Sequence, residues 1–567
     1  MAELILPGVY IEVRAEGLIV PGRVTVGNLG VVGTASKGET DEPILLSSYA
    51  EARQHFGNYD SFIDPTTVPP KPRANSLTLV RALEQAFSFG ATTVFAVRVA
   101  DSTTVKAASH TLTKGNDKVV TLTAKTPGTW GNELKINVAA AEETAFVEDE
   151  KVDPATPKLT HKPVVQSARN RVTHTSAATG ITRTFSGGNI VYTGAPTADQ
   201  AKIDPAAGDL TFHASLGLAA ADKLVVSYAV DKASAVKVTL RLGTVDEVYT
   251  VVSGKDLIAD IAEQSVWVDG TAETKAGELP DLSSPAGAFA SFKDGANGEA
   301  GADYKGGLEK LENKDAHIIV AAGQDDGFGN ELDKHCQKAS SDLIKRDRIA
   351  VVGSHLQDPK KPDEFFDYLT GHSLASDRVI FVAPGIAAND TAATPPEKVT
   401  LPGAYAAAAV AGLLSSFSAH ISLTNKTLPV DALERRFTSA ELTQLVQSRV
   451  LALEQRLGFR IVKGITTSTN TAFAQITTRR IVDFAKFGVR SAATPYIGLL
   501  NNERVRGALR ATINSFLAEM VDDEMLVSYE LTVTATRQEE IKGIARVTLV
   551  LRPTFSIDFI KVTMNLE

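Results

Sequence analysis

Cysteine is nearly missing from this sequence, in which Cys336 is the only one among 567 residues. A single thiol cannot form an internal disulfide, and within a helical pattern it is more often a small core residue than a nucleophile. We therefore expect a protein made in a reducing compartment. The sequence also has no excess of positive charge. The net charge of −9 argues against a protein that neutralises nucleic-acid phosphates with a basic stripe.

Long apolar runs are also missing. A membrane-spanning helix needs about 20 apolar residues, whereas the longest candidate, residues 404–417 (AYAAAAVAGLLSSF), is short and rich in alanine. We interpret this run as a buried helix. The first residues carry Glu3 where a signal peptide has its basic start, and no small-residue cleavage site follows. We expect neither an export signal nor membrane insertion.

Several short motifs resemble those of enzymes, but the predicted elements around them do not fit an active site. Residues 371–375 (GHSLA) resemble a nucleophile elbow, which needs a strand before the serine and a helix after it. Here a helical pattern precedes Ser373 and a strand pattern follows it. The loop 323–330 (GQDDGFGN) opens a helix, but Asp325 and Asp326 would repel a bound phosphate. The ten histidines show no metal-ligand spacing. We predict no catalytic residue, no cofactor and no metal.

The patterns that are present favour an α/β framework. Residues 23–104 contain buried strand patterns alternating with helical stretches, and two further strand–helix–strand units lie between residues 315 and 385. Consecutive units of this kind predict a parallel sheet covered by helices. Ser48, with Glu51 three residues later, predicts a capping box at the start of a helix.

A change in composition marks an insertion. Residues 142–235 are rich in Thr, Ala, Gly, Asp and Pro, and their short alternating runs are separated by turn residues. This texture is typical of a small all-β module. The flanking segments, residues 126–138 and 235–262, have the patterns of framework strands, and we expect them to pair with each other across the insertion.

The first strand pattern has no obvious partner nearby. In VYIEV, Val9, Ile11 and Val13 lie on one side and Tyr10 on the other, as in a half-buried strand. The next stretch, residues 17–30, is broken by several glycines and a proline and predicts no tight hairpin. We expect the partner of this strand to come from elsewhere.

The C-terminal end shows the same problem. Pro553 cannot donate a ladder hydrogen bond and separates two strand-like runs. In the last run, the first three apolar residues alternate at odd positions and the following four at even positions. They are Phe555, Ile557 and Phe559, then Ile560, Val562, Met564 and Leu566. Upstream, residues 502–521 have a helical pattern. Its apolar stripe comprises Val505, Leu509, Phe516, Leu517 and Met520.

Five segments occur in a fixed order along the chain. They are LPGVYIEV at 6–13, GVVGTASKGETDEPILLSSYAEARQHFG at 30–57, GATTVFAVRV at 90–99, PGTWGNELKINV at 127–138, and the sequence from 435 to 567. In this order and spacing they resemble the contractile tail sheath family of bacteriophages and related injection systems. The chain departs from the family in two places, because residues 142–235 have no counterpart in the smallest sheaths and the positions near Pro402 are rich in alanine.

The resemblance implies a multidomain α+β and α/β fold. Its N- and C-terminal parts form a discontinuous α/β framework, which carries an inserted all-β module and extended terminal arms. The implied ranges are 1–22 for the N-terminal arm, 23–104 for the first part of the core domain, 105–141 with 236–430 for a middle α/β domain, 142–235 for an outer β module, 431–553 for the second, tube-facing part of the core domain, and 554–567 for the C-terminal arm.

The resemblance also implies a structural function without catalysis. Sheath subunits polymerise as a helical cylinder around a rigid tube, with an expected sixfold symmetry, and contraction drives the tube through a target cell envelope. The expected partners are further copies of the chain, the tail tube protein, and the baseplate and tail terminator proteins. The expected location is the virion tail, assembled in the bacterial cytoplasm. The alternative is another phage structural protein, from the baseplate, the capsid or an outer-surface adhesin.

Two sets of site residues follow from the resemblance. The terminal arms of sheath subunits add strands to neighbouring subunits. This implies strand exchange by Val9, Tyr10, Ile11, Val13, Phe555, Ile557, Phe559, Val562 and Met564. A helix of the last block lies on the inner wall, which implies tube contact by Arg504, Arg506 and Arg510. The alternative for these arginines is ion pairing inside the subunit, because they crowd the N-terminal half of a helix against its dipole.

Overall fold

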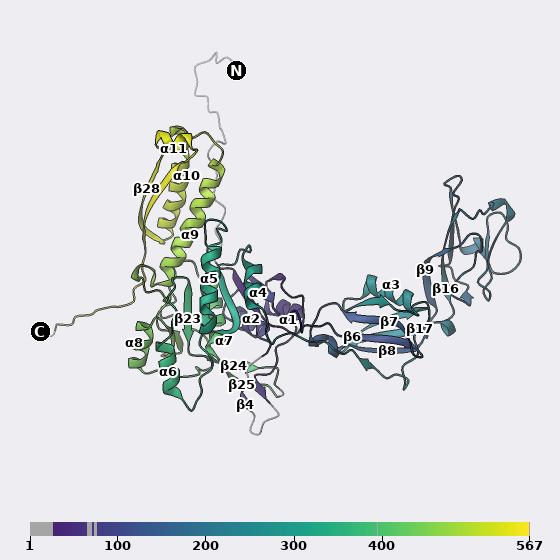
Figure 1. The fold of residues 1–567 in the computed structure, drawn as a ribbon, viewed down its shortest axis with the longest axis horizontal. Helices are drawn as coiled ribbons and strands as arrows, with labels where there is room; N and C mark the ends of the chain where they lie inside the picture. Colours follow the sequence, from purple (N-terminus) through teal and green to yellow (C-terminus); the bar gives the residue numbers. More distant parts are fainter. Residues whose placement is uncertain (1–26, 65–70, 73–75, 394, 566–567) are drawn as a thin grey trace, which may run out of the picture. The chain divides into compact units, whose positions relative to one another are not determined.

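The computed structural model describes residues 27–64, 71–72, 76–393 and 395–565, which form two compact units. The first unit comprises Met1–Ala35, Thr40–Val99 and Glu299–Glu567, and the second comprises Ser36–Glu39 and Ala100–Gly298. Figure 1 shows the ribbon coloured along the sequence. The predicted N-terminal arm, with Val9, Tyr10, Ile11 and Val13, lies outside the described residues.

An eight-stranded sheet forms the centre of the first unit, in the order β2-β5-β1-β21-β22-β23-β26-β27. Its six inner strands are parallel, and an antiparallel strand closes each edge. The strands are β1 (Leu29–Gly33), β2 (Pro43–Leu46), β5 (Val94–Arg98), β21 (Ile318–Asp325), β22 (Ile349–Gly353), β23 (Val379–Ala383), β26 (Leu451–Gln455) and β27 (Phe459–Ile461).

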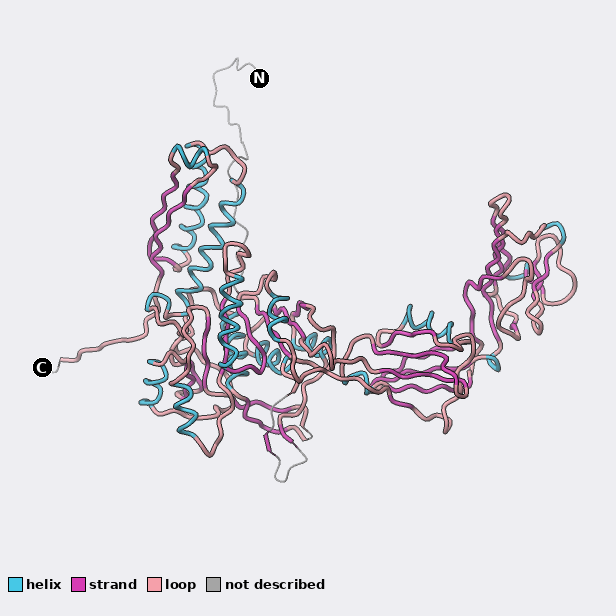
Figure 2. The backbone as a smooth tube through the Cα atoms, viewed as in Figure 1, coloured by secondary structure: helices cyan, strands magenta, loops and turns pink. Residues whose placement is uncertain are grey.

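Helices cover both faces of this sheet (Figure 2). One face packs on α1 (Tyr49–Phe56), α2 (Leu79–Ser88) and α7 (Gly403–Ser415), and the other packs on α4 (Tyr304–Leu311), α5 (Gly329–Ala339), α6 (Pro362–Thr370) and α8 (Ser439–Gln447). Successive strand residues point to opposite faces, so Val31 belongs to the first apolar cluster and Val32 to the second. The layers are therefore α/β/α, as the alternating strand and helix patterns predict.

Local sequence signals explain several of these elements. The alanine-rich run forms α7, which is buried along almost its whole length, as predicted. Ser48 accepts a hydrogen bond from the Glu51 amide at the start of α1, but the Glu51 carboxylate bonds to Ser47 instead of completing the predicted capping box. Two short hairpins complete this part of the unit: β3 (Ile63–Asp64) with β4 (Lys71–Pro72), and β24 (Ile386–Asp390) with β25 (Glu397–Leu401).

The predicted middle domain, residues 105–141 with 236–430, is wrong for the part after Gly298. Residues 299–430 do not join residues 105–141, because β21 pairs with β1 and continues the sheet through β22 and β23. The second unit ends at Gly298. Parallel strands pair through backbone hydrogen bonds, which are the same for every residue type and so do not reveal the partner from the sequence. Here the paired strands β1 and β21 are also separated in sequence by the whole second unit. The sequence pattern therefore showed the strands but not their neighbours.

The second unit contains two apolar clusters. The first cluster packs α3 (Gly254–Gln264) against a four-stranded and a three-stranded sheet. Their strands are β6 (Ser109–Lys114), β7 (Asp117–Ala124), β8 (Lys135–Ala140), β17 (Val236–Leu242), β18 (Val245–Val251), β19 (Val268–Ala272) and β20 (Ala290–Ser291). β8 and β17 are antiparallel, which confirms that the segments flanking the insertion pair with each other.

The second cluster is formed almost entirely by residues of the insertion. It lies between a five-stranded and a three-stranded sheet. Their strands are β9 (Ala145–Val152), β10 (Val164–Val165), β11 (Arg171–Thr175), β12 (Thr182–Ser186), β13 (Ile190–Val191), β14 (Ala201–Ile203), β15 (Leu210–Phe212) and β16 (Lys223–Val230). A buried hydrogen bond between His174 Nε2 and the Asp222 carboxylate, 2.8 Å long, adds to this core.

The C-terminal module of the first unit has its own apolar cluster. It consists of α9 (Ile476–Ala493), α10 (Glu503–Asp522), β28 (Leu526–Thr534), α11 (Arg537–Ile541) and β29 (Arg546–Pro553). The predicted stripe of α10 is buried at Leu509, Phe516, Leu517 and Met520, together with Ile513. Within the described part of the chain, no helix combines the length and apolar character needed to span a membrane.

Candidate functional site

The groups that would suggest catalysis have structural roles. Cys336 is fully buried in α5, and burial raises the pKa of its thiol to about 12, so it stays protonated. Ser373 lies exposed in the loop between α6 and β23, without the strand that a nucleophile elbow requires before it. His372 is buried and bonds through Nε2 to the Ser448 carbonyl, 2.6 Å away. These residues do not form a nucleophile and base pair.

One cluster of possible metal ligands escaped the sequence analysis. Side-chain ligand atoms of Asp325, Asp326 and His355 lie within 4.8 Å of one another. Asp325 caps the following 3₁₀ turn, and Asp326 accepts a hydrogen bond from Tyr368. Because His355 follows a different strand, no sequence spacing links it to the two aspartates. Asp325 and Asp326 thus already accept hydrogen bonds from the Gly327 amide and the Tyr368 hydroxyl.

The C-terminal tail, residues 554–565, has neither helix nor strand and exposes its apolar side chains. The exposed fractions are 60% for Phe555, 81% for Ile557, 80% for Phe559, 74% for Val562 and 85% for Met564. Figure 1 shows this tail leaving the first unit. The structure thus leaves uncovered the same apolar positions that the sequence analysis selected.

Polar contacts fix the beginning of the tail. The Thr554 amide donates to the Met525 carbonyl, 3.1 Å away. Asp558 forms an ion pair with Lys463, 3.3 Å away, and accepts a hydrogen bond from Gln475 at 3.4 Å. The Lys463 ammonium also lies 5.5 Å from the centre of the Phe559 ring. The tail therefore leaves the body at a defined point and presents apolar side chains beyond it.

The strands β28 and β29 form a two-stranded sheet with two unpaired edges among the described residues. One face packs on α10 through Leu531 and its neighbours, and the other exposes Val527 and Val550, by 67% and 48%. An edge strand presents unpaired amides and carbonyls that can pair with another strand. Sheets of two strands are marginal until they gain further strands or a packed face.

The three arginines of α10 differ in their surroundings. Arg506 forms an ion pair with Glu540, 3.0 Å away, and donates to Asn501 at 2.9 Å, so its charge is satisfied within the subunit. Arg504 and Arg510 are exposed. The helix begins at the Asn502 cap, whose side chain accepts from the Val505 amide. Arg506 is therefore paired inside the subunit, as in the alternative to tube contact, while Arg504 and Arg510 remain available to a partner.

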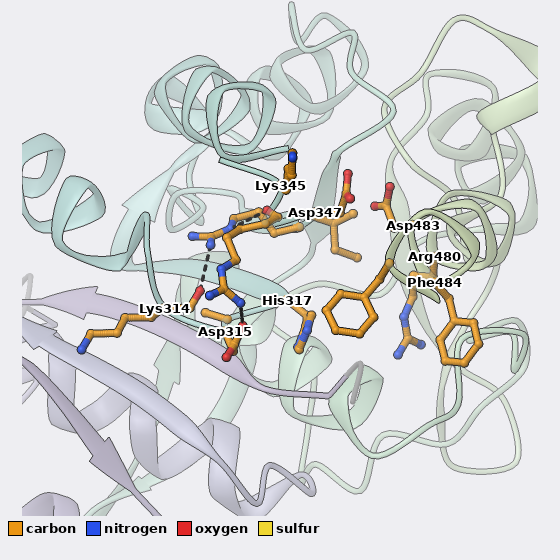
Figure 3. A pocket seen from close by; sticks show the side chains of 13 residues that line it. Lys314, Asp315, His317, Lys345, Asp347, Arg480, Asp483 and Phe484 are labelled. Atoms are coloured by element: carbon orange, nitrogen blue, oxygen red, sulfur yellow. Dashed lines mark hydrogen bonds and ion pairs between the residues drawn. The ribbon is translucent and has the colours of Figure 1, made fainter. Parts of the chain in front are cut away.

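A small cavity of about 50 Å³ lies where α9 meets the ends of β21 and β22. Its lining is rich in cationic residues, including Arg348 and Arg480. Figure 3 shows Phe484 and Arg480 on one side of it and His317 on the other. Burial, with the nearby charges of Arg348 and Arg480, lowers the pKa of His317 to about 4, so His317 is neutral at pH 7.

The guanidinium groups of Arg348 and Arg480 bind backbone carbonyls of the chain itself. All five N–H groups of Arg348 have partners, which are the carbonyls of Leu311, Glu312, Lys314 and Arg346 and the ring of His335. Arg480 donates to the carbonyls of Phe417 and Ser418. The cationic lining therefore reflects helix and loop capping.

Beside this cavity, a network of buried ion pairs joins α9 to the sheet. Asp483 of α9 binds Arg378 at 2.8 and 3.1 Å and Arg479 at 2.6 Å. Asp347, which precedes β22, binds Arg490 at 2.6 Å and also contacts Lys486. The charge of Asp483 raises the pKa of Arg378 although burial acts to lower it. The network fixes the C-terminal module on the α/β/α body.

Comparison with known proteins decides the family. Residues 297–467 match the phage tail sheath protein central domain, and residues 468–567 match the phage tail sheath C-terminal domain. Residues 297–567 therefore carry the central and C-terminal domains of the phage tail sheath family. The chain is accordingly a structural tail-sheath subunit, a component of the tail of a virion or of an injection system.

The fold of this sheath subunit is shared with two solved sheath proteins. The sheath tail protein of Desulfitobacterium hafniense is 16% identical, with a TM-score of 0.57 over 96% of this chain and 100% of that chain. The sheath tail protein of Listeria innocua is 13% identical, with a TM-score of 0.54 over 94% of this chain and 96% of that chain. No match to a curated protein was found by sequence.

The sequence analysis also missed the ionic network of α9. Arg479, Asp483, Lys486 and Arg490 recur every three to four residues on α9, which is a signal for one charged helix face. Their partners Asp347 and Arg378 lie more than 100 residues away in sequence. The helix face was therefore detectable from the sequence, whereas its partner was not.

Proposed function

We propose that the chain polymerises as a helical cylinder around a rigid inner tube, and that contraction of this sheath drives the tube through a target cell envelope. The observation that carries the proposal is the uncovered apolar tail beside a two-stranded sheet with open edges, in a chain with both sheath domains. One subunit presents an uncovered apolar tail and also the open edge of a sheet. Such a subunit can form a chain of links with its copies.

In this proposal, Phe555, Ile557, Phe559, Val562 and Met564 of one subunit add a strand to β28 or β29 of its neighbour. Val9, Tyr10, Ile11 and Val13 add the N-terminal strand at the other edge. Two added strands would extend the two-stranded sheet, which already packs on α10, to four strands. Ladder hydrogen bonds would hold each link while the globular units move to new contacts during contraction.

The contact with the tube is proposed to involve α10 through Arg504 and Arg510. Both are exposed, which leaves their charges available to acidic groups on the tube. Exposed ion pairs contribute only about 0–1 kcal/mol each and weaken with salt, as a contact that must break on contraction requires. Arg506 stays paired with Glu540 and would orient the start of α10.

The remaining parts of the proposal concern the assembly. The sheath would have sixfold symmetry, contact baseplate and tail terminator proteins at its ends, and be assembled in the bacterial cytoplasm. It would act without catalysis, because the energy of contraction comes from interfaces that are better paired in the contracted state. The inserted module, residues 142–235, would face outward, because an insertion facing the tube would block the lumen.

The test is removal of the C-terminal tail. A subunit lacking residues 554–567 should keep its melting temperature but form no cylinders in negative-stain images, because the link between subunits is lost. The matched control changes only the three polar residues Thr554, Ser556 and Thr563 to alanine and should still assemble. Cylinders of normal length from the truncated subunit would contradict the strand-exchange proposal.

A further inference from the structure

The carboxyl ends of two adjacent strands bring together three side chains that can bind a cation. Asp325 is the last residue of β21 and Asp326 follows it, while His355 lies two residues beyond the end of β22. The two strands are parallel neighbours, and Asp325 pairs with Gly353. In open α/β sheets, ligands bind outside the carboxyl ends of the strands. We call Asp325, Asp326 and His355 the β21–β22 cluster.

A local irregularity of β21 directs the two aspartates toward the end of β22. The pairing of the two strands shifts register between Val320 and Asp325, and Gly323 within this stretch has a φ of 73°, a conformation that favours glycine. Such an irregularity changes the direction of the side chains that follow it. Ligand atoms of the β21–β22 cluster lie within 4.8 Å of one another.

The neighbours of the cluster orient its carboxylates without neutralising them. Tyr368 of α6 donates to Asp326, and the Gly327 amide donates to Asp325 at 3.1 Å. Burial, followed by the hydrogen bond to Asp326 and the charge of that carboxylate, raises the pKa of Tyr368, so its hydroxyl stays protonated and donates. Among the described residues, no lysine or arginine forms an ion pair with either aspartate. Two adjacent carboxylates are thus left without a cationic partner.

His355 distinguishes the cluster from an ordinary acidic surface. Its ring packs on Tyr368, with ring centres 4.0 Å apart, and on Phe365 at 5.6 Å, so packing fixes its orientation. The two ring nitrogens take no part in the hydrogen bonds and ion pairs of the described residues, although both carboxylates are within 4.8 Å. The gap between nitrogen and carboxylate is therefore too wide for a hydrogen bond. A gap of this size is bridged by a metal ion whose bonds to each side are about 2.0–2.2 Å long.

We propose that Asp325, Asp326 and His355 form a binding site for a first-row divalent cation, with Zn²⁺ as the preferred ion. An imidazole ligand favours Zn²⁺ over Mg²⁺ and Ca²⁺, which prefer oxygen ligands. Three atoms no more than 4.8 Å apart share a centre at most about 2.8 Å from each, and side-chain rotation closes the remaining difference to a Zn²⁺ bond length. Two of the three side chains are exposed, which leaves the other coordination positions to water. The cation would neutralise the two carboxylates and link the loop before α5 to the loop before α6.

The experiment compares two double variants of equal chemistry. Asp325→Asn with His355→Phe removes two ligands but keeps a side-chain oxygen for the turn amide and a ring against Tyr368. Asp358→Asn with His213→Phe is the matched control, because it changes an exposed aspartate of the loop before α6 and an exposed histidine, both outside the cluster. Each full-length protein is freed of metal with a chelator and titrated by calorimetry with Zn²⁺ alone and with Mg²⁺ alone. Thermal melting is followed without metal and with about 1 mM Zn²⁺.

The unmodified protein and the control should bind one more Zn²⁺ per chain than the cluster variant, with a dissociation constant below about 100 μM, and about 1 mM Zn²⁺ should raise their melting temperature by about 2 °C or more. Mg²⁺ should bind at least about tenfold more weakly. Equal Zn²⁺ stoichiometry in the cluster variant and the unmodified protein would overturn the inference, as would Mg²⁺ binding as tight as that of Zn²⁺. If the cluster variant melts early without metal, the same titration of the single variant His355→Phe decides, since it leaves both aspartates and their hydrogen bonds in place.

Discussion

At the scale of single residues, Gly488 controls how closely α9 and α10 approach. The residue is buried in α9, and a Cβ atom placed there would lie 1.9 Å from Cζ of Phe516 on α10. Phe516 stacks on Phe484 of α9 with ring centres 5.8 Å apart. The absence of a side chain at Gly488 therefore makes room for the aromatic pair that joins the two helices.

We expect Gly488→Ala to lower the free energy of unfolding by about 1–3 kcal/mol, because the added methyl group displaces the ring of Phe516 from a packed site. Urea unfolding followed by circular dichroism measures this change. The matched control is Gly507→Ala in α10, where a Cβ atom meets nothing within 4 Å. Alanine at that helical site should be neutral or stabilising by up to about 1 kcal/mol. Equal effects of the two substitutions would contradict this account of Gly488.

At the scale of elements, the helices are attached in two different ways. α7 is held on the sheet by apolar contacts along almost its whole length. α9 is held by charges at the ends of the inner strands β22 and β23, since Asp483 binds Arg378 and Arg479 in a site where all three side chains are at most 12% exposed. Removing one member of a buried ion pair leaves an uncompensated charge.

Asp483→Ala should therefore lower the free energy of unfolding by about 3–5 kcal/mol and loosen α9 before the rest of the body. Hydrogen exchange should accelerate in α9 and α10 while the amides of β1 and β22 keep their protection. Asp431→Ala is the control, because its ion pair with Lys398 is more than half exposed and contributes about 0–1 kcal/mol. Uniform acceleration across the sheet would show that α9 is not a separately held element.

At the scale of the whole molecule, the insertion has a simple connection to the rest of the chain. The last residue of β8, Ala140, pairs directly with Val236, the first residue of β17. The two ends of the insertion are therefore adjacent partners of an antiparallel ladder. The apolar cluster of the insertion draws on few residues outside it, among them Ala141 and Val252.

We expect that replacing residues 141–235 with Asn-Gly, which favours a two-residue hairpin turn, leaves a folded subunit that still forms cylinders. Melting curves and negative-stain images measure the two outcomes. Replacing residues 236–242, the strand β17, is the contrasting control and should prevent folding of the second unit, since it removes the centre of a four-stranded sheet. Loss of folding on removal of the insertion would show that its core belongs to the second unit as a whole.

Sequence reasoning succeeded where a short segment carries its own signal. The alternation of β1 and β22, the alanine-rich α7 and the stripe of α10 follow from local periodicity. The tail could be located from the sequence because Pro553 cannot donate a ladder hydrogen bond and separates the tail from the preceding strand. The domain boundary at Gly298 was not predictable, since it depends on the pairing of β1 with β21 and not with the strands of the second unit, which are nearer in sequence.

The sequence by itself determined the family resemblance, through the order of five segments along the chain. It also determined the α/β character of the framework, the insertion and the position of the apolar tail, because each of these depends on residues that are close together in the chain. Only the tertiary structure decided which strands are neighbours, that Arg506 is paired with Glu540, and that two loops some 40 residues apart meet around a hollow beside α10. These depend on distant groups brought together by packing. The residues next to Arg506 in the sequence are the same whether its partner is Glu540 or another protein, so they cannot identify the partner.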